Sequence, residues 1–238
     1  MKIHRFIFTG DISSSQITLQ DEALVHQLFH VLRLQPGEYI QLCDGRGQEV
    51  KARILEISKK NILLHAEERL SSISESVRRI TLYVSILKRE NMAWVVQKAT
   101  EVGVAAIVPV ICHRTVKQEV RMDRLQEIAR EAAEQSGRGI VPVVHEPMSF
   151  GDALSHAQKN EENVFFHTNP LTDSAQKHPH RPEGTMGVFV GPEGGWDEEE
   201  VAQAVQRGCC LSSLGSFVLR GETAAVVASY AAVHGLLF

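Results

Sequence analysis

The stretch from residue 79 to residue 137 alternates apolar strands with amphipathic helices, and this alternation decides the fold class. It begins with RITLYVSIL (79–87) and NMAWVVQKATEVG (91–103) and continues with AAIVPVI (105–111) and MDRLQEIAREAAEQSG (122–137). The short apolar runs predict buried strands, and the periodic segments predict helices, each of which ends at a glycine. A β-α-β-α order favours a parallel sheet covered by helices.

The same pattern continues toward the C-terminus. FGDALSHAQ and NVFFHT (150–168) predict a helix and a strand, and the polar residues 169–184 predict an exposed loop. TMGVFVGPEGGWDEEEVAQAVQRG (185–208) predicts a strand, a glycine turn and a helix with Asp197 as its N-cap. Residues 209–238 predict a last strand, a loop and a helix rich in small residues. We therefore expect an α/β domain that reaches the end of the chain.

The first seventy residues have a different pattern, with short alternating runs and one helical segment at 21–34. Turn residues separate the runs, which predicts a small barrel or meander with strands at 2–8, 38–43, 49–57 and 61–68. The polar segment SSISES (71–76) follows a complete set of strands. We therefore expect two domains, residues 1–72 and residues 73–238.

The composition is that of a globular protein, with 43% hydrophobic and 23% charged residues in 238. No apolar run approaches the roughly 18 residues of a membrane span, and the start lacks a signal-peptide core. We therefore expect a cytoplasmic protein that does not bind a membrane. Four cysteines without CxxC spacing are expected to be small buried hydrophobic residues: Cys43, Cys112, Cys209 and Cys210.

The charge is unevenly distributed. The net charge of −4 argues against a protein held on nucleic acid by its total charge. Residues 78–138, however, carry eleven Lys and Arg against seven Asp and Glu, whereas residues 139–238 carry five against twelve. A basic middle is sufficient to steer an RNA, and an ordinary solvated face is the alternative. Charge alone leaves both interpretations open.

Two glycine-containing loops are the main candidates for a site. GPEGGW (191–196) follows a predicted buried strand, at the place where open α/β sheets bind ligands. It matches no dinucleotide or phosphate-loop pattern, and the acidic start of the next helix would repel phosphate, so a cationic or neutral ligand is favoured. The second loop, LGSFVLRGETA (214–224), carries Arg220 and Glu222 in an apolar context. In the alternative, the first loop is a structural turn, Glu222 and Thr223 cap the last helix, and Arg220 pairs with a carboxylate.

Other candidates are weaker. His26 and His30 have the spacing of helical zinc ligands but lack a third ligand, so we expect no metal. His178 and His180 lie in the polar loop, and no GxSxG motif supports a hydrolase. Trp94 lies on an apolar helix face and is expected in the core.

The motif series of the chain resembles that of the ribosomal RNA small subunit methyltransferase E family, which belongs to the SPOUT class. The resemblance covers nearly the whole chain, and its motifs are HRF (4–6), VLRL (31–34), DGRG (44–47), QKATEVGV (97–104), HRTV (113–116), EAAEQSGR (131–138), GPEGG (191–195) and the loop at 214–224.

The resemblance implies a homodimeric enzyme that transfers a methyl group from S-adenosylmethionine to N3 of a uridine in 16S ribosomal RNA, with the small ribosomal subunit as its expected partner. It also implies a SPOUT-type parallel-sheet domain with a trefoil knot and an N-terminal PUA-like β-barrel. The alanines of the last helix, Ala224, Ala225, Ala228 and Ala232, are expected either at a dimer contact or on a face buried within the chain.

The resemblance also assigns roles to residues. It places the methyl donor on Gly191, Pro192, Glu193, Gly194, Gly195, Leu214, Gly215, Ser216, Leu219, Glu222 and Thr223. Arg220 is the expected catalytic residue, which would stabilise charge on the uridine carbonyls. RNA contacts are expected from Arg5, Arg33, Arg46, Arg114 and Arg138.

The chain departs from the family pattern in the second loop. Ser216 and Phe217 stand where the family usually has Pro-Arg, and Gly221 stands where Thr or Ala is usual. The alternative function is therefore an RNA-binding or ribosome-assembly protein that keeps the fold but has lost methyl transfer.

Overall fold

The structure is a computed structural model that describes residues 3–71, 77–115, 119–168 and 183–236. These residues form two compact units, one of residues 1–75 and 133–141 and the other of residues 76–132 and 142–238. Segment 133–141 thus belongs with the N-terminal residues, which a division at residue 72 does not anticipate. In the described part of the chain no helix is long and apolar enough to cross a membrane.

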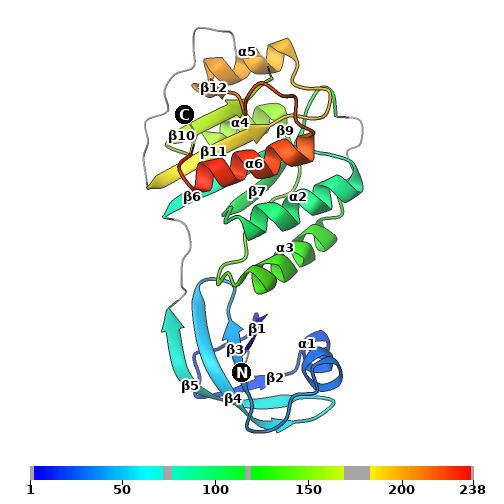
Figure 1. Cartoon of the computed structure of the whole chain (residues 1–238), viewed down its shortest axis with the longest axis vertical. Helices are drawn as coiled ribbons and strands as arrows, with labels where there is room; N and C mark the ends of the chain where they lie inside the picture. The colour runs from blue at the N-terminus through cyan, green and yellow to red at the C-terminus, as the bar shows by residue number, and fades with distance from the viewer. Residues whose placement is uncertain (1–2, 72–76, 116–118, 169–182, 237–238) are drawn as a thin grey trace. The chain divides into compact units, whose positions relative to one another are not determined.

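The first unit is a five-stranded sheet with one helical segment (Figure 1). The sheet order is β1-β3-β4-β5-β2, in which only the pairing of β1 with β3 is parallel. Sequence patterning predicted four of these strands and missed β2. The elements are β1 (His4–Ile7), β2 (Gln16–Leu19), α1 (Glu22–His26), β3 (Tyr39–Cys43), β4 (Gln48–Ile57) and β5 (Ile62–Ser71).

The helical segment of this unit is shorter than residues 21–34. Asp21 caps α1 by accepting a hydrogen bond from the Leu24 amide at 2.8 Å, and the chain then makes a π-helical turn, η1 (Gln27–Val31). Arg33 follows with φ of +53°, a left-handed conformation that side chains rarely adopt. The wider turn and the left-handed residue end the helix before Pro36.

Segment 133–141 is bound to this sheet by backbone contacts. The Gly47 amide donates to the Gly139 carbonyl at 3.1 Å, and the Val141 amide donates to the Gly45 carbonyl at 3.0 Å. The Ile7 amide donates to the Glu134 carboxylate at 2.8 Å. Hydrogen bonds from three points of the segment explain why it completes the first unit.

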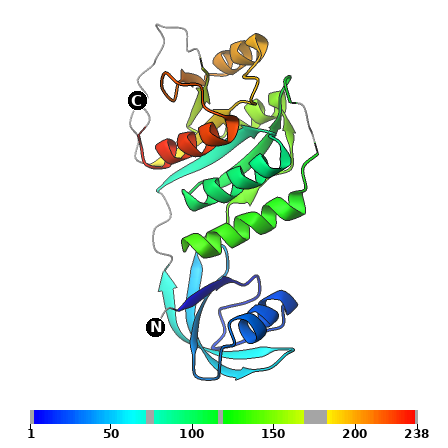
Figure 2. The ribbon, with the colours of Figure 1, turned by 45° about the vertical axis from the view of Figure 1, so that its right-hand side comes forward.

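The second unit is the parallel sheet that the alternating pattern predicted (Figure 2). Its order is β12-β10-β11-β6-β7-β8, and β9 also pairs with β7. Every pairing is parallel. Its strands are β6 (Arg78–Ser85), β7 (Ala106–Ile111), β8 (Val143–Val144), β9 (Met148–Ser149), β10 (Glu162–Phe166), β11 (Gly184–Val190) and β12 (Cys210–Ser212).

Helices cover both faces of this sheet, so its central strands are buried throughout. The helix α6 packs against β6 and β11 with α2 at its side, whereas α4 and α5 pack on Tyr83, Phe165 and Phe189 of the other face. The helices are α2 (Arg89–Glu101), α3 (Met122–Ser136), α4 (Phe150–Ala157), α5 (Glu198–Gln206) and α6 (Gly221–Val233). The α/β class is confirmed. The trefoil knot stays a prediction, because the path of the chain includes residues 169–182, which lie outside the described part.

Two expectations about helix faces are now resolved. Trp94 was expected in the core, but its side chain is 41% exposed. Three of the four alanines named on α6 are buried within the chain, since Ala225, Ala228 and Ala232 have no exposed surface, whereas Ala224 is partly exposed and lines the pocket described below. Small residues there allow α6 to pack closely on the sheet and on α2.

Candidate functional site

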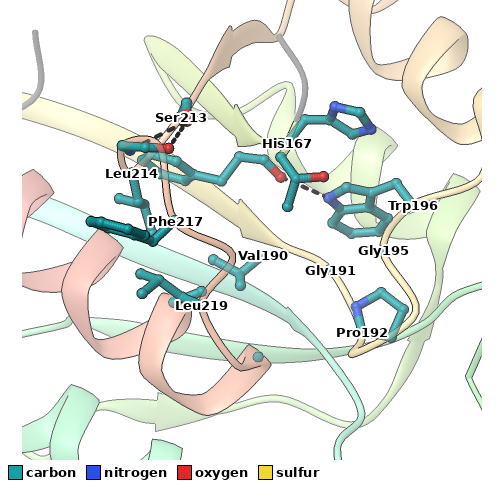
Figure 3. A pocket seen from close by; sticks show the side chains of 15 residues that line it. His167, Val190, Gly191, Pro192, Gly195, Trp196, Ser213, Leu214, Phe217 and Leu219 are labelled. Carbon is teal, nitrogen blue, oxygen red and sulfur yellow. Dashed lines mark hydrogen bonds between the residues drawn. The ribbon is translucent and has the colours of Figure 1, made fainter.

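A pocket lies at the carboxyl ends of β10, β11 and β12, all within the second unit (Figure 3). It encloses about 580 Å³, with the open space at its mouth included. Both loops singled out in the sequence contribute to it. Its walls are formed by Phe166, His167, Thr168, Val190, Gly191, Pro192, Gly195, Trp196, Ser213, Leu214, Gly215, Phe217, Leu219, Gly221 and Ala224.

The first loop is fixed by a close contact between Gly191 and Trp196. A Cβ atom at residue 191 would lie 3.0 Å from the indole ring, which leaves space for glycine alone. The ring is 5% exposed and packs on Phe165 with 4.4 Å between ring centroids. Its Nε1–H donates to the carbonyl oxygen of Phe166 at 3.0 Å (Figure 3). The indole thus joins the end of β10 to the loop after β11.

The rest of this loop is a tight turn that leads into α5. The Gly195 amide donates to the Pro192 carbonyl at 2.8 Å, and Gly195 has φ of +72°. Asp197 caps α5, as predicted, within a capping box completed by Glu200. The buried Glu200 carboxylate accepts from the Asp197 amide and from the His113 amide, both at 2.9 Å. The acidic residues Asp197 and Glu200 therefore stabilise the start of α5 and its contact with residue 113.

In the structure the acidic residues of the first loop and of α5 do not line the pocket, although the sequence argument about the ligand's charge relied on them. Glu193 is exposed and does not line the pocket, and the Glu200 carboxylate is engaged by two amides. Among the described residues that form the walls there is no Asp, Glu, Lys or Arg. Apolar side chains, backbone and a few polar side chains bound the pocket there, which favours recognition of a ligand by shape and hydrogen bonds.

The second loop runs from β12 to α6 beside the first loop. Gly215 has φ of +113°, and its amide donates to the Ser213 hydroxyl at 3.3 Å. A Cβ atom at Gly221 would lie 3.0 Å from Leu87 and 3.6 Å from the Gly191 carbonyl oxygen, so the two loops meet at this glycine. Phe217 lines the pocket although its side chain is 85% exposed.

Arg220 lies between two pocket residues, Leu219 and Gly221, and is exposed. It is the N-cap of α6, and its carbonyl accepts from the Ala224 amide at 2.8 Å. Glu222 instead accepts from the Asn91 side chain at 3.2 Å. Within the described residues of this chain no ion pair of Arg220 is found, so the pairing with a carboxylate that the structural alternative expects is not seen there.

The predicted donor residues separate into two groups. The structure brings six of them together on the pocket walls, namely Gly191, Pro192, Gly195, Leu214, Gly215 and Leu219. The other five lie outside the walls, namely Glu193, Gly194, Ser216, Glu222 and Thr223.

Sequence reasoning missed the contribution of β10. Phe166, His167 and Thr168 line the pocket because β10 lies between β12 and β11 in the sheet. The signal was present, since these residues end a predicted strand, but the strand order was needed to place that end between the two loops. The amide of His167 donates to the Ser212 carbonyl at 2.9 Å, which extends the pairing with β12 into the pocket wall.

The five predicted RNA-contact arginines have different surroundings. Arg33, Arg46 and Arg114 are exposed, and Arg114 donates to the Gly194 carbonyl at 2.7 Å. Arg5 forms an ion pair with the buried Glu49, and its Nε donates to the Cys43 sulfur at 2.9 Å. Arg138 is only 8% exposed, so little of its side chain is open to a phosphate. Arg114 connects the basic middle of the sequence directly to the first loop.

The remaining candidates do not form a second reactive centre. The His26 and His30 rings lie 5.0 Å apart, and among the residues described no cluster of three metal-ligating side chains is found. His178 and His180 lie outside the described residues. Burial raises the pKa of Cys112 and of Cys209 to about 12, which keeps both thiols protonated and weakly nucleophilic near neutral pH.

Two family models match the chain. A model described as an RNA methyltransferase domain matches residues 74–233, and a model described as an RNA methyltransferase PUA domain matches residues 20–67. The first therefore covers the parallel-sheet unit with both pocket loops. The second covers most of the strands of the N-terminal sheet.

Relatives align along most of the chain. The ribosomal RNA small subunit methyltransferase E of Rickettsia conorii is 28% identical and covers 96% of this chain and 94% of its own length. The protein of that name from Synechocystis is 30% identical and covers 90% of this chain and 72% of its own length.

A solved structure is also similar over its full extent. The crystal structure of a ribosomal RNA small subunit methyltransferase E from Neisseria gonorrhoeae bound to S-adenosyl methionine is 34% identical. It superposes with a TM-score of 0.86 and covers 97% of this chain and 96% of that one. Because a family model spans most of the chain and named relatives match both of its parts, the chain belongs to the ribosomal RNA small subunit methyltransferase E family.

Proposed function

We propose that this protein transfers the methyl group of S-adenosylmethionine to N3 of a uridine in 16S ribosomal RNA of the small ribosomal subunit. The observation that carries the proposal is the pocket at the ends of β10, β11 and β12, where both predicted loops meet at Gly191 and Gly221. The relative of known structure binds S-adenosyl methionine, and the relatives are named for the small-subunit ribosomal RNA.

The chemistry of the pocket fits the methyl donor. A Cβ atom added at Gly195 or Gly215 would have no neighbour within 4 Å, so the absence of these Cβ atoms leaves open space beside the backbone. Leu214 and Leu219 offer apolar surface to an adenine ring, and the neutral walls do not repel a sulfonium.

The donor supplies an electrophilic methyl carbon. The uridine N3 lone pair forms the new bond to that carbon, the carbon–sulfur bond breaks with its electron pair going to sulfur, and the N3 proton leaves to a base. This proton lies on the pairing edge of the base, so the uridine has to be flipped out of any duplex first. We assign Arg220 to the carbonyl oxygens beside N3, where a guanidinium stabilises the negative charge that develops as the proton leaves.

The RNA is held by both parts of the chain in this proposal. Residues 1–72 act as the RNA-gripping domain and residues 73–238 as the donor-binding, dimerising domain of a cytoplasmic homodimer. Arg33, Arg46 and Arg114 are the exposed phosphate contacts, whereas Arg5 and Arg138 act chiefly by positioning their neighbours.

The test is mass spectrometry of nucleosides from 16S ribosomal RNA of a strain that lacks the protein. Small subunits from that strain are incubated with purified protein and S-adenosylmethionine. We expect 3-methyluridine to be absent at first and restored afterwards. Its presence throughout would exclude this target.

The role of Arg220 needs a separate comparison. Arg220→Gln is expected to lower kcat by about 100-fold while leaving donor affinity within about twofold, since the pocket walls are retained. Arg207→Gln is the matched control, because Arg207 is also exposed and lies on neither loop. An equal fall of kcat in Arg220→Gln and Arg207→Gln would contradict the catalytic role proposed for Arg220.

The departures in the second loop support a second candidate, an RNA-binding assembly protein without transferase activity. Phe217 occupies a position where the family usually has a charged residue, and its ring is exposed at the pocket. Thermal unfolding with and without S-adenosylmethionine separates the two. A competent donor site raises the melting temperature, whereas no shift at millimolar donor favours the second candidate.

A further inference from the structure

The carboxylate of Glu222 lies in the first turn of α6, two residues after Arg220. It accepts a hydrogen bond from the side-chain amide of Asn91, with 3.2 Å between Nδ2 and Oε2. Asn91 lies in the first turn of α2, so this bond joins the starts of two helices that pack on each other. Glu222 thus has a partner on a different element from the loop that carries Arg220.

Arg220 is the other group to which this carboxylate could turn. The two side chains leave the chain two residues apart, and no other carboxylate is as near to Arg220 in the sequence. Residues two apart inside a helix do not face each other. Arg220, however, precedes the helix with an extended backbone, φ of −64° and ψ of 152°, so this restriction does not apply to the pair.

The backbone between the two residues is fixed by packing. A Cβ atom at Gly221 would lie 3.0 Å from Leu87 and 3.6 Å from the Gly191 carbonyl oxygen, and Leu87 is buried. The start of α6 is therefore held in place by its surroundings. Whether Glu222 contacts Asn91 or Arg220 is then decided by side-chain rotation alone.

The choice of partner affects the charge that Arg220 presents. A guanidinium that forms an ion pair with Glu222 has its positive charge compensated, and its N–H groups are directed toward α6. Such a group stabilises a developing negative charge on another molecule less well. In the structure the amide of Asn91 occupies the carboxylate, and the Arg220 side chain is exposed and forms no ion pair with the other described residues.

We propose that Asn91 is a positioning residue of the methyl transfer, which holds Glu222 on α2 and thereby leaves the Arg220 guanidinium available to the uridine. The inference rests on the proposed function, because Asn91 acts through Arg220. It also gives Glu222 a role other than binding the methyl donor, in agreement with its place outside the pocket walls. A neutral amide suits this task, since it donates a hydrogen bond to the carboxylate without adding a charge.

The kinetic test begins with Asn91→Leu, which removes the amide but keeps a side chain of similar size. Glu222 is then free to pair with Arg220. Because exposed ion pairs are weak, we expect kcat on small subunits from the deficient strain to fall about threefold to fivefold. The affinity for S-adenosylmethionine should stay within about twofold of wild type, since neither Asn91 nor Glu222 lines the first pocket.

A second substitution separates this role from a structural one. Glu222→Gln removes the competing charge, so the double variant Asn91→Leu with Glu222→Gln should recover most of the lost kcat. If the hydrogen bond only stabilised the fold, the double variant would stay as impaired as Asn91→Leu. Gln97→Leu is the matched control, because Gln97 is an exposed polar residue of the same helix.

Chemical modification of Arg220 gives a readout that needs neither the methyl donor nor RNA. Phenylglyoxal reacts with free guanidinium groups, and mass spectrometry measures the rate for the peptide that contains Arg220. We expect Asn91→Leu to slow this reaction about threefold to fivefold and Glu222→Gln to restore it. Arg207, which is exposed at the end of α5, is the reference within each sample.

Wild-type kcat in Asn91→Leu would overturn the inference, as would a double variant that recovers neither kcat nor the modification rate. Melting temperatures are measured for all variants, and Asn91→Ala replaces Asn91→Leu if the leucine prevents folding. Failure of the proposed function is distinguishable, because then the wild-type protein itself forms no 3-methyluridine. The modification of Arg220 would still show whether Asn91 controls the pairing of Glu222.

Discussion

Replacing Gly191 by alanine tests whether the close approach of the first loop to Trp196 shapes the donor pocket. The added methyl group would lie 3.0 Å from the indole ring, which is 5% exposed and closely packed. The ring therefore has to move, and its hydrogen bond to the Phe166 carbonyl is strained or lost. Because Gly191, Trp196 and Phe166 all line the pocket, donor affinity falls together with stability.

The size of the effect follows from the contacts. Overpacking by one methyl group costs about 1–3 kcal/mol, and a lost hydrogen bond costs about 1 kcal/mol. The lower entropy of the unfolded alanine chain offsets about 0.4–1 kcal/mol. A net loss of about 1–3 kcal/mol lowers the melting temperature of a domain of this size by about 3–9 °C.

Tryptophan emission and titration with S-adenosylmethionine measure the two consequences. The chain has two tryptophans, so a Trp94→Phe background makes the emission specific for Trp196. Gly208→Ala is the matched control, because Gly208 has φ of +80° and a Cβ there meets no atom within 4 Å. Gly208→Ala should lower the free energy of unfolding by about 1–2 kcal/mol through backbone strain. It should leave the Trp196 emission and the affinity for S-adenosylmethionine unchanged. Wild-type emission and affinity in Gly191→Ala would refute the reasoning.

Three further predictions concern buried groups. Arg78→Met removes the buried partner of the mostly buried Glu162 carboxylate, so it should lower the free energy of unfolding by about 3 kcal/mol in urea titrations, and the double variant with Glu162→Met should recover much of the loss. Burial lowers the pKa of His145 and of His156, so the unfolded chain binds protons at a higher pH than the folded one, and the free energy of unfolding should fall as the pH drops through 6.5. Replacing both histidines by Gln should flatten this dependence of stability on pH, and an unchanged dependence would contradict the prediction. Iodoacetamide at pH 8 should label native Cys210 first: burial raises the pKa of all four thiols, to about 11 or 12 for Cys43, Cys112 and Cys209, but Cys210 is the one cysteine that is partly exposed.

The features that could be predicted from the sequence are helix ends, helix caps and buried strands, which depend on local sequence pattern. The glycines that end α2 and α3, Gly103 and Gly137, both have positive φ, which is the conformation that a helix-ending glycine supplies. Asp197 caps α5 as its position before three glutamates indicated. The central strands are buried on both faces, as their continuous apolar runs require in a parallel sheet. Each of these features needs only a few neighbouring residues.

What escaped prediction depends on contacts between distant residues. Trp94 lies on an apolar stretch, yet its side chain is 41% exposed, because which face of α2 is covered depends on how the helices pack on the sheet. Segment 133–141 joins the N-terminal unit through backbone hydrogen bonds to Gly45 and Gly47, which no periodicity reveals. The π-turn after α1 and the left-handed Arg33 also went unpredicted, because helix periodicity predicts neither conformation.

The absence of charge on the first pocket's walls fits the ligand that the proposed function requires. Among the residues that the structure describes, no Asp, Glu, Lys or Arg lines this pocket. A donor with a cationic sulfur is accepted by neutral walls and would be repelled by an arginine placed there. Ser216 and Phe217 stand where the family usually has Pro-Arg, so Arg220 is the one basic residue between residues 214 and 224. The comparison of Arg220→Gln with Arg207→Gln therefore tests the whole positive charge that the second loop can supply to the proposed transfer.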